Sequence, residues 1–200
     1  MVKARIAVFV SGGGTNLQAL IDAQGSVIKS GEIVLVISSS ADAYALKRAE
    51  KAGIPGIFVS KAEGQKRFEK DVIKLLKDYS IDFIVLAGFM TILSKEFTKE
   101  YSGRIINIHP ALIPSFCGKG FYGLKVHEAA LARGVKLTGA TVHFVDEVVD
   151  GGEIIAQKAV EVKEGDTPEI LQKRVMEEAE WVILPGVIGD IAKGELSIGE

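Results

Sequence analysis

Short, nearly continuous apolar runs recur along this chain, and the stretches between them have helical periodicity. The first run is Ile6-Ala7-Val8-Phe9-Val10, and a later one is Phe83-Ile84-Val85-Leu86-Ala87. Runs of this kind are typical of parallel strands that are buried on both faces. Between them, residues 66–79 carry an apolar stripe at helical intervals, formed by Phe68, Val72, Leu75 and Leu76. The alternation predicts an α/β fold with a mostly parallel central sheet.

A glycine turn, Ser11-Gly12-Gly13-Gly14-Thr15-Asn16, follows the first predicted strand and precedes a predicted helix. This order brings backbone N–H groups and the positive end of a helix to one place, which is the geometry of a phosphate site. Thr15 and Asn16 either add donors to that site or only cap the helix. The turn lacks the Gly-Lys-Ser/Thr of a P-loop, and Leu17 stands where dinucleotide-binding turns have their third glycine. The turn therefore favours a single phosphate on a small ligand.

The stretch Ile105-Ile106-Asn107-Ile108-His109 is rich in β-branched residues and ends before Pro110, so it is expected to be a strand. Side chains two positions apart share one face of a strand, which places Asn107 beside His109. An amide donor next to an imidazole can stabilise negative charge on a carbonyl oxygen and move a proton. The alternative is a buried pair whose hydrogen bonds go to the next loop, and the spacing alone leaves both open.

Two further segments are candidates for the lining of a site. Residues 88–93 follow the strand at 83–87 and either line a ligand at the edge of the sheet or begin a core helix. The strand 138–145 carries His143, which faces either the site or the core. An acidic turn then leads to an antiparallel return strand at 154–162. In that turn, Asp150 either supports the local backbone or orients an imidazole and accepts a proton.

The remaining segments are simpler. Thr167-Pro168 begins a helix, with Thr as cap and Pro at the first position, and Pro185-Gly186 is expected to end it. Residues 115–123 mix three glycines with three aromatic residues and form a candidate lid beside the site. His127 is expected on the face of a helix over 125–133.

Composition narrows the class of protein. The 200 residues carry a net charge of −2 and contain no run of Lys and Arg, which argues against nucleic acid or a membrane as partner. Cys117 is the single cysteine, so no internal disulfide and no multi-cysteine metal site can form. No apolar stretch has the length of a signal peptide's core or of a membrane span. We expect one cytoplasmic domain over residues 1–200.

Several of these segments resemble, in order and spacing, the folate-dependent formyltransferases, and above all the phosphoribosylglycinamide formyltransferases. The matching segments are 11–18, 86–90, 107–110, 139–145 and 150–152. The resemblance implies a Rossmann-like formyltransferase fold, whose mostly parallel sheet has an antiparallel edge and helices on both faces. It also implies a phosphate-binding half of about residues 1–100 and a catalytic and folate half of about residues 101–200.

The resemblance further implies a reaction. The formyl group of 10-formyltetrahydrofolate, the co-substrate, would be transferred to the amine of glycinamide ribonucleotide in purine biosynthesis, without a metal. These two small molecules would be the partners, and a homodimer is compatible with the family.

Site residues follow from the same resemblance. The catalytic set would be Asn107, His109 and Asp150, with His143 as support. The ribonucleotide would be bound by Gly12, Gly13, Gly14, Thr15, Asn16 and Glu180. The folate would be bound by Met90, Thr91, Ile92, Leu93, Asn107, Asp146, Glu147, Val148, Val149 and Asp150.

Those residue types suit the chemistry. The amine attacks the formyl carbon and creates a tetrahedral intermediate with a negative oxygen. Asn107 and a protonated His109 can donate hydrogen bonds to that oxygen, and each such donor typically lowers the barrier by about 3 kcal/mol. Asp150 would hold the imidazolium and help carry the proton from the amine to the leaving nitrogen, through water.

Three departures and two alternatives accompany the resemblance. Gln65, Lys66 and Arg67 occupy the region where the family often has an Arg for the folate. Trp181 rather than a His follows Glu180, and the loop 117–123 is longer and more aromatic than is common. The alternatives are a 10-formyltetrahydrofolate hydrolase that lacks its regulatory domain and, in another class, a flavodoxin-like protein that binds a phosphate or a flavin.

Overall fold

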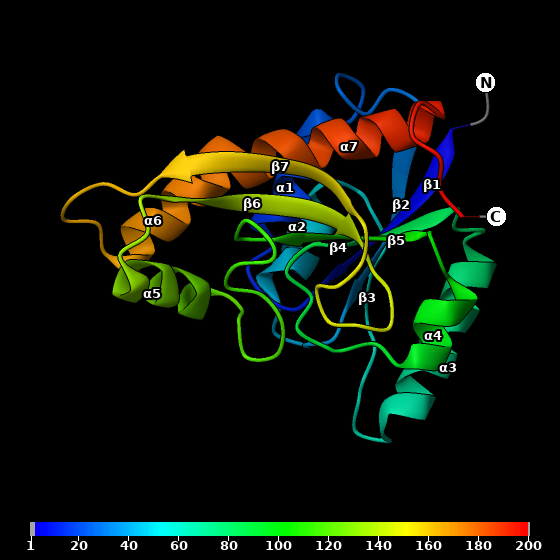
Figure 1. The fold of residues 1–200 in the computed structure, drawn as a ribbon. Helices are drawn as coiled ribbons and strands as arrows, with labels where there is room; N and C mark the ends of the chain where they lie inside the picture. Colours follow the sequence, from blue (N-terminus) through cyan, green and yellow to red (C-terminus); the bar gives the residue numbers. More distant parts are fainter. Residues whose placement is uncertain (1–2, 200) are drawn as a thin grey trace.

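A computed structural model describes residues 3–199, and all its named strands belong to one seven-stranded sheet (Figure 1). The order across the sheet is β3-β2-β1-β4-β5-β6-β7. β1 to β5 pair in parallel, whereas β6 and β7 pair antiparallel at one edge, as the sequence predicted. The strands are β1 (Ala4–Val10), β2 (Gly31–Ser38), β3 (Gly56–Phe58), β4 (Phe83–Leu86), β5 (Ile105–His109), β6 (Leu137–Phe144) and β7 (Ile154–Glu161).

Helices lie close to the positions that periodicity predicted. They are α1 (Thr15–Ala23), α2 (Tyr44–Lys51), α3 (Gln65–Asp78), α4 (Lys95–Glu100), α5 (Leu124–Arg133), α6 (Pro168–Val175), the π-helical turn η1 (Met176–Glu180) and α7 (Trp181–Lys193). Thr167 caps α6 by accepting a hydrogen bond from the backbone N–H of Ile170, with Pro168 at the first helical position, as expected. No helix in residues 3–199 has the length and apolar character needed to cross a membrane.

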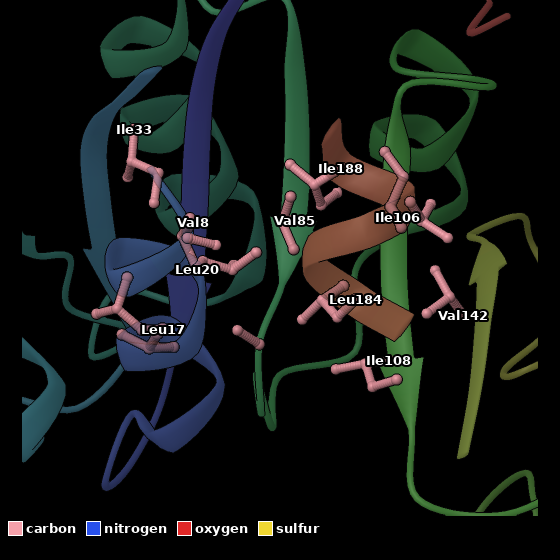
Figure 2. Close-up of a cluster of buried hydrophobic side chains, with 14 of the residues drawn as sticks. Val8, Leu17, Leu20, Ile33, Val85, Ile106, Ile108, Val142, Leu184 and Ile188 are labelled. Carbon is pink, nitrogen blue, oxygen red and sulfur yellow. The ribbon is translucent and has the colours of Figure 1, made fainter. Parts of the chain in front are cut away.

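Alternating side chains of the buried strands build two separate cores, one on each face of the sheet. Val8, Leu20 and Leu184 belong to the core on the face covered by α1 and α7 (Figure 2). Phe9, the neighbour of Val8, packs with Phe68 of α3 and Phe97 of α4 on the other face. These side chains are fully buried or nearly so. The predicted layers, with helices on both faces, are therefore confirmed.

The same alternation decides where the polar residues of β5 point. Ile106 and Ile108 face the core beneath α7 (Figure 2). Asn107 and His109 must then lie on the opposite face of the strand. In the antiparallel pairing of β5 with β6, Asn107 is opposite His143. The register thus gathers three polar side chains on one face.

The site lies near the point where the strand order reverses. The chain proceeds from β1 outward to β3, returns to β4 beside β1, and then proceeds outward in the other direction. Carboxyl ends of strands at such a reversal form the ligand crevice of open α/β sheets. The segments that leave β1 and β4 are in contact there, since the backbone N–H of Met90 donates to Ser11 Oγ at 2.9 Å. Residues 88–93 form a loop and do not begin a helix.

The expectation that Pro185-Gly186 ends a helix is wrong, because Pro185 lies inside α7, which continues to Lys193. A proline in a helix removes one hydrogen bond and costs roughly 3 kcal/mol. Burial of each large apolar side chain contributes about 1.5–3 kcal/mol, and α7 buries Leu184, Val187, Ile188 and Ile191. Packing against the sheet therefore outweighs the proline penalty.

Candidate active site

Asn107 and His143 form a hydrogen-bonded pair across β5 and β6. Asn107 Nδ2 lies 3.1 Å from His143 Nε2, and His143 Nδ1 lies 2.7 Å from the carbonyl oxygen of Phe144. A carbonyl can only accept, so Nδ1 carries the proton and Nε2 accepts from the Asn107 amide. Burial lowers the pKa of His143, which is 1% exposed, and this favours the neutral ring. His143 therefore faces the site and fixes the orientation of the Asn107 amide.

His109 lies between two acceptors. Its Nε2 is 2.9 Å from the carbonyl oxygen of Phe116, and its Nδ1 is 3.6 Å from Asp150 Oδ2. The ring is 4% exposed. Each ring nitrogen therefore faces an oxygen to which an N–H could donate. The structure brings together the predicted pair of imidazole and carboxylate.

Asp150 is oriented toward the imidazoles and not toward its own turn. Its Oδ1 is 3.8 Å from His143 Nε2, and its Oδ2 accepts a hydrogen bond of 2.8 Å from the backbone N–H of Gly118. The local support of the turn comes from Asp146, whose Oδ1 accepts from the backbone N–H of Val148 at 2.8 Å. Asp150 itself has φ of 55°, a left-handed conformation that is uncommon for a residue other than glycine. Backbone strain of this kind concentrates at functional sites.

The glycine turn begins α1 without a side-chain cap. Gly14 occupies the cap position in the left-handed conformation, with φ of 71°. Thr15 Oγ1 points to Met176 Sδ at 3.6 Å, and Asn16 Nδ2 donates to Glu180 Oε2 at 2.6 Å. The alternative that these two residues only cap the helix is therefore wrong, because both side chains reach across to η1.

Glu180 is a buried carboxyl group next to the glycine turn. It is 5% exposed, and burial raises its pKa to about 7, although the hydrogen bond from Asn16 works in the opposite direction. It is the last residue of the π-helical turn η1. Turns of this kind often occur at functional sites. The predicted ribonucleotide residues Asn16 and Glu180 are thus in direct contact, although they are far apart in the sequence.

Apart from Asn107 on β5, the residues predicted to bind folate belong to two loops at the same edge of the sheet. Large apolar side chains are exposed there: Met90 and Ile92 after β4, and Val148 and Val149 after β6. An ion pair of 3.3 Å between Lys95 and Glu147 joins the two segments. Exposed apolar side chains on facing loops are typical of a site for a flat, partly apolar ligand.

Other polar residues near these loops have structural partners. Gln65 Nε2 donates to the carbonyl oxygen of Ile92 at 3.1 Å, whereas Arg67 pairs with Asp71 in a solvent-exposed ion pair on α3. Burial, followed by the nearby Asp150, raises the pKa of the Cys117 thiol, which does not favour a thiolate nucleophile. Within residues 3–199, no cluster of His, Cys, Asp and Glu is arranged to hold a metal ion.

His127 lies on α5, as expected, and the helix face that carries it is buried, since the residue is 1% exposed. Neither ring nitrogen has a hydrogen-bond partner in the described part of the chain. Burial, and after it the nearby His109, lowers the pKa of His127 to about 4. The ring is therefore neutral at physiological pH.

Comparison with known protein families identifies the family to which a chain with this site belongs. The family model described as "Formyl transferase" matches residues 4–188. The chain belongs to the formyl transferase family. The Asn107-Ile108-His109-Pro110 strand end, the glycine turn and Asp150 all lie within the matched range.

Relatives of this formyl transferase are known in sequence and structure. It is 40% identical to the phosphoribosylglycinamide formyltransferase of Escherichia coli, over 98% of this chain and 90% of that protein. It is 46% identical to the trifunctional purine biosynthetic protein adenosine-3 of Gallus gallus, but spans only 19% of that longer protein. The crystal structure of glycinamide ribonucleotide transformylase 1 from Symbiobacterium toebii is similar, with a TM-score of 0.90 and 41% identity over 98% of this chain and 91% of that one.

Sequence reasoning missed three contacts in this formyl transferase. The carbonyl of Phe116 and the N–H of Gly118 bind His109 and Asp150, and Arg48 of α2 binds the glycine turn. Backbone groups of a loop leave no signal in a sequence. Arg48 is one of several basic residues on an exposed helix, so its position along the chain did not distinguish it.

Proposed function

We propose that this formyl transferase moves the formyl group of 10-formyltetrahydrofolate to the amine of glycinamide ribonucleotide, giving the N-formyl product and tetrahydrofolate in purine biosynthesis. The observation that carries the proposal is the convergence of Asn107, His109 and Asp150 at the end of β5. The relatives of similar length with this activity in their names support it.

The proposed reaction is a direct attack. The amine nitrogen of the ribonucleotide bonds to the formyl carbon, and the carbonyl oxygen becomes negative. His143 holds one N–H of the Asn107 amide, and the other, which has no acceptor among residues 3–199, can donate to that oxygen. His109 supplies a second donor by exchanging the Phe116 carbonyl for the substrate oxygen. Donors fixed in place before the reaction stabilise the developing charge most effectively.

Proton transfer completes the proposed sequence. The attacking amine loses a proton, and the folate nitrogen gains one as its bond to carbon breaks. Asp150 lies within 4 Å of both His109 and His143 and is able to receive and return this proton through water. Atoms and charge balance without a covalent enzyme intermediate, which agrees with a Cys117 thiol that is not activated.

Substrate binding is proposed at the two sides of this cluster. Gly12, Gly13, Gly14, Thr15, Asn16 and Glu180 hold the ribonucleotide. The folate is held by Met90, Thr91, Ile92, Leu93, Asn107 and residues 146–150. The first group is supported by the start of α1 and the Asn16–Glu180 hydrogen bond, and the second by the exposed apolar side chains on two loops.

Folate absorbance with and without the ribonucleotide tests the proposal. Rapid turnover only when glycinamide ribonucleotide is present is the expected result. Equal turnover in both reactions would instead indicate a 10-formyltetrahydrofolate hydrolase. A yellow purified protein with a bound flavin would indicate the flavodoxin-like alternative.

Three finer predictions remain part of the proposal. They are one domain over residues 1–200, with a phosphate-binding and a folate-binding half, a homodimer, and a cytoplasmic location. The single sheet that both halves share supports the first of them.

A further inference from the structure

The glycine turn lies directly against α2. The backbone N–H of Ala45 donates to the Gly12 carbonyl at 3.1 Å, and Arg48 Nε donates to the Gly13 carbonyl at 2.8 Å. A Cβ on Gly14 would lie only 2.6 Å from the Cβ of Ala45. Both the left-handed φ of Gly14 and this close approach require glycine.

These two hydrogen bonds determine the direction of the neighbouring N–H groups. In a planar trans peptide, the carbonyl of one residue and the N–H of the next point in opposite directions. Because the carbonyls of Gly12 and Gly13 point to α2, the N–H groups of Gly13 and Gly14 point away from it. Neither N–H has an acceptor among residues 3–199. Two donors without a partner among the described residues are therefore directed away from α2, and the second belongs to Gly14, the N-cap residue of α1.

Arg48 is itself held in place. Its Nη1 donates to Gln18 Oε1 on α1 at 3.0 Å, and its guanidinium carbon lies 5.1 Å from the centre of the Tyr44 ring. Arg48 pairs with no carboxylate in the part of the chain that the structure describes. Its positive charge thus lies behind the turn without a compensating anion.

We propose that Arg48 is a positioning residue of the phosphate site and sets the preference for a phosphorylated substrate. It fixes the peptide between Gly13 and Gly14, and its charge favours an anion at the two free N–H groups. It does not contact the reacting atoms. The inference rests on the proposed function, in which the glycine turn receives the phosphate of the ribonucleotide.

Kinetics with Arg48→Ala test the inference. The KM for glycinamide ribonucleotide should rise roughly tenfold to a hundredfold, the effect of losing a charged hydrogen bond. The kcat should change less than about threefold, since the transition-state donors are untouched. The kcat/KM for the dephosphorylated glycinamide ribonucleoside should not change. Equal losses for both substrates would mean general damage to the fold and would overturn the proposal.

Two further variants separate charge from position. Arg48→Lys keeps the charge but lacks the fork of donors that binds Gly13 and Gln18 together. We expect its KM to resemble that of the Ala variant, and a wild-type KM would contradict the positioning role. Lys47→Ala is the matched control, because it removes a positive charge from the same helix without a hydrogen bond to the turn. Its KM should match the wild type.

A titration followed by NMR tests the inference without turnover. In ¹⁵N-labelled wild-type protein, ribose 5-phosphate should shift the amide signals of Gly13 and Gly14. In Arg48→Ala, half-saturation should need at least about ten times more ligand. If the wild type bound ribose 5-phosphate but formylated no ribonucleotide, the proposed reaction would fail while the inference stood. An unchanged half-saturation in the variant would overturn the inference alone.

Discussion

At the scale of single residues, the site depends on which hydrogen atoms remain available for the substrate. One N–H of Asn107 donates to His143, and the other has no acceptor in the described part of the chain. The His109 ring has an acceptor near each nitrogen. Asp150 lies near both imidazoles. These four side chains therefore lie in one polar cluster, so that removal of one member changes the surroundings of the others.

His109→Ala and Asp150→Asn should each reduce kcat by about 10²–10⁴-fold, the usual contribution of a positioned acid or base. The glycine turn is unaffected by either change, so ribose 5-phosphate should bind both variants as it binds the wild type. Steady-state kinetics and calorimetric titration measure these two quantities. A variant with near-normal kcat would remove its residue from the mechanism.

Glu180 should make stability depend on pH. Its pKa of about 7 in the folded protein lies above the ordinary value of 4.5, so unfolding releases a proton between these values. The free energy of unfolding therefore falls as pH rises from about 4.5 to 7 and stays lowered above that. At 1.36 kcal/mol per pKa unit, the contribution is of the order of 3 kcal/mol across the window.

Glu180→Gln should remove this contribution while keeping an oxygen that accepts from Asn16. Urea denaturation at pH 5 and pH 8 measures the effect, and the decrease in stability between these values should be smaller in the variant. Glu178→Gln is the control, because Glu178 is exposed on the same turn. An identical decrease in the wild type and Glu180→Gln would show that Glu180 does not titrate in this window.

At the scale of secondary-structure elements, the β6–β7 edge positions the catalytic side chains. The register of these strands shifts between Val142 and His143. A bulge of this kind redirects a side chain and is common beside active sites. The turn that follows carries Asp150 back toward β5. The antiparallel edge therefore completes a site that the parallel strands begin.

Gly152→Ala should disturb this edge. A Cβ at position 152 would lie 1.9 Å from the carbonyl oxygen of Phe144, which accepts the hydrogen bond from His143 Nδ1. Relief of the clash must move that carbonyl, so kcat should fall more than about tenfold and stability by about 1–3 kcal/mol. Thermal denaturation and steady-state kinetics are the measurements.

Gly186→Ala provides the comparison for the Gly152 variant. A Cβ at position 186 meets nothing within 4 Å, and the residue lies inside α7. The free energy of unfolding of the Gly186→Ala variant should rise by roughly 0.5–1 kcal/mol, since alanine is the better helix former. The kcat of this variant should stay unchanged. Wild-type kcat in Gly152→Ala would show that the Phe144 carbonyl has no part in orienting His143.

At the scale of the whole molecule, local patterns predicted the parts and missed the contacts between distant parts. Apolar runs and helical spacing gave the strands, most helix positions and the mixed edge, because burial on one or two faces imposes those periods. The acidic turn made Asp150 a candidate and the resemblance supplied Glu180, but local patterns could not join either residue to its partners. The Asn16–Glu180 bond spans 164 positions in sequence and the Arg48–Gly13 bond spans 35. No period in the sequence encodes either contact.

Tertiary packing also explains the one wrong helix boundary. The Pro185 signal is local, whereas the apolar face of α7 gains its stability only against the sheet. A comparable limit applies to His127, whose burial depends on how α5 packs against α6. In both cases the tertiary environment of the residue, and not its type alone, determines whether it can lie inside a helix or be buried.

The fate of the formyl carbon tests the central claim most directly. The enzyme is supplied with glycinamide ribonucleotide and with 10-formyltetrahydrofolate that carries ¹³C in the formyl group. Mass spectrometry then identifies the product that contains the label. We predict that the label appears in the N-formyl ribonucleotide, one for each tetrahydrofolate released. Label recovered as free formate, with the ribonucleotide unchanged, would contradict the account.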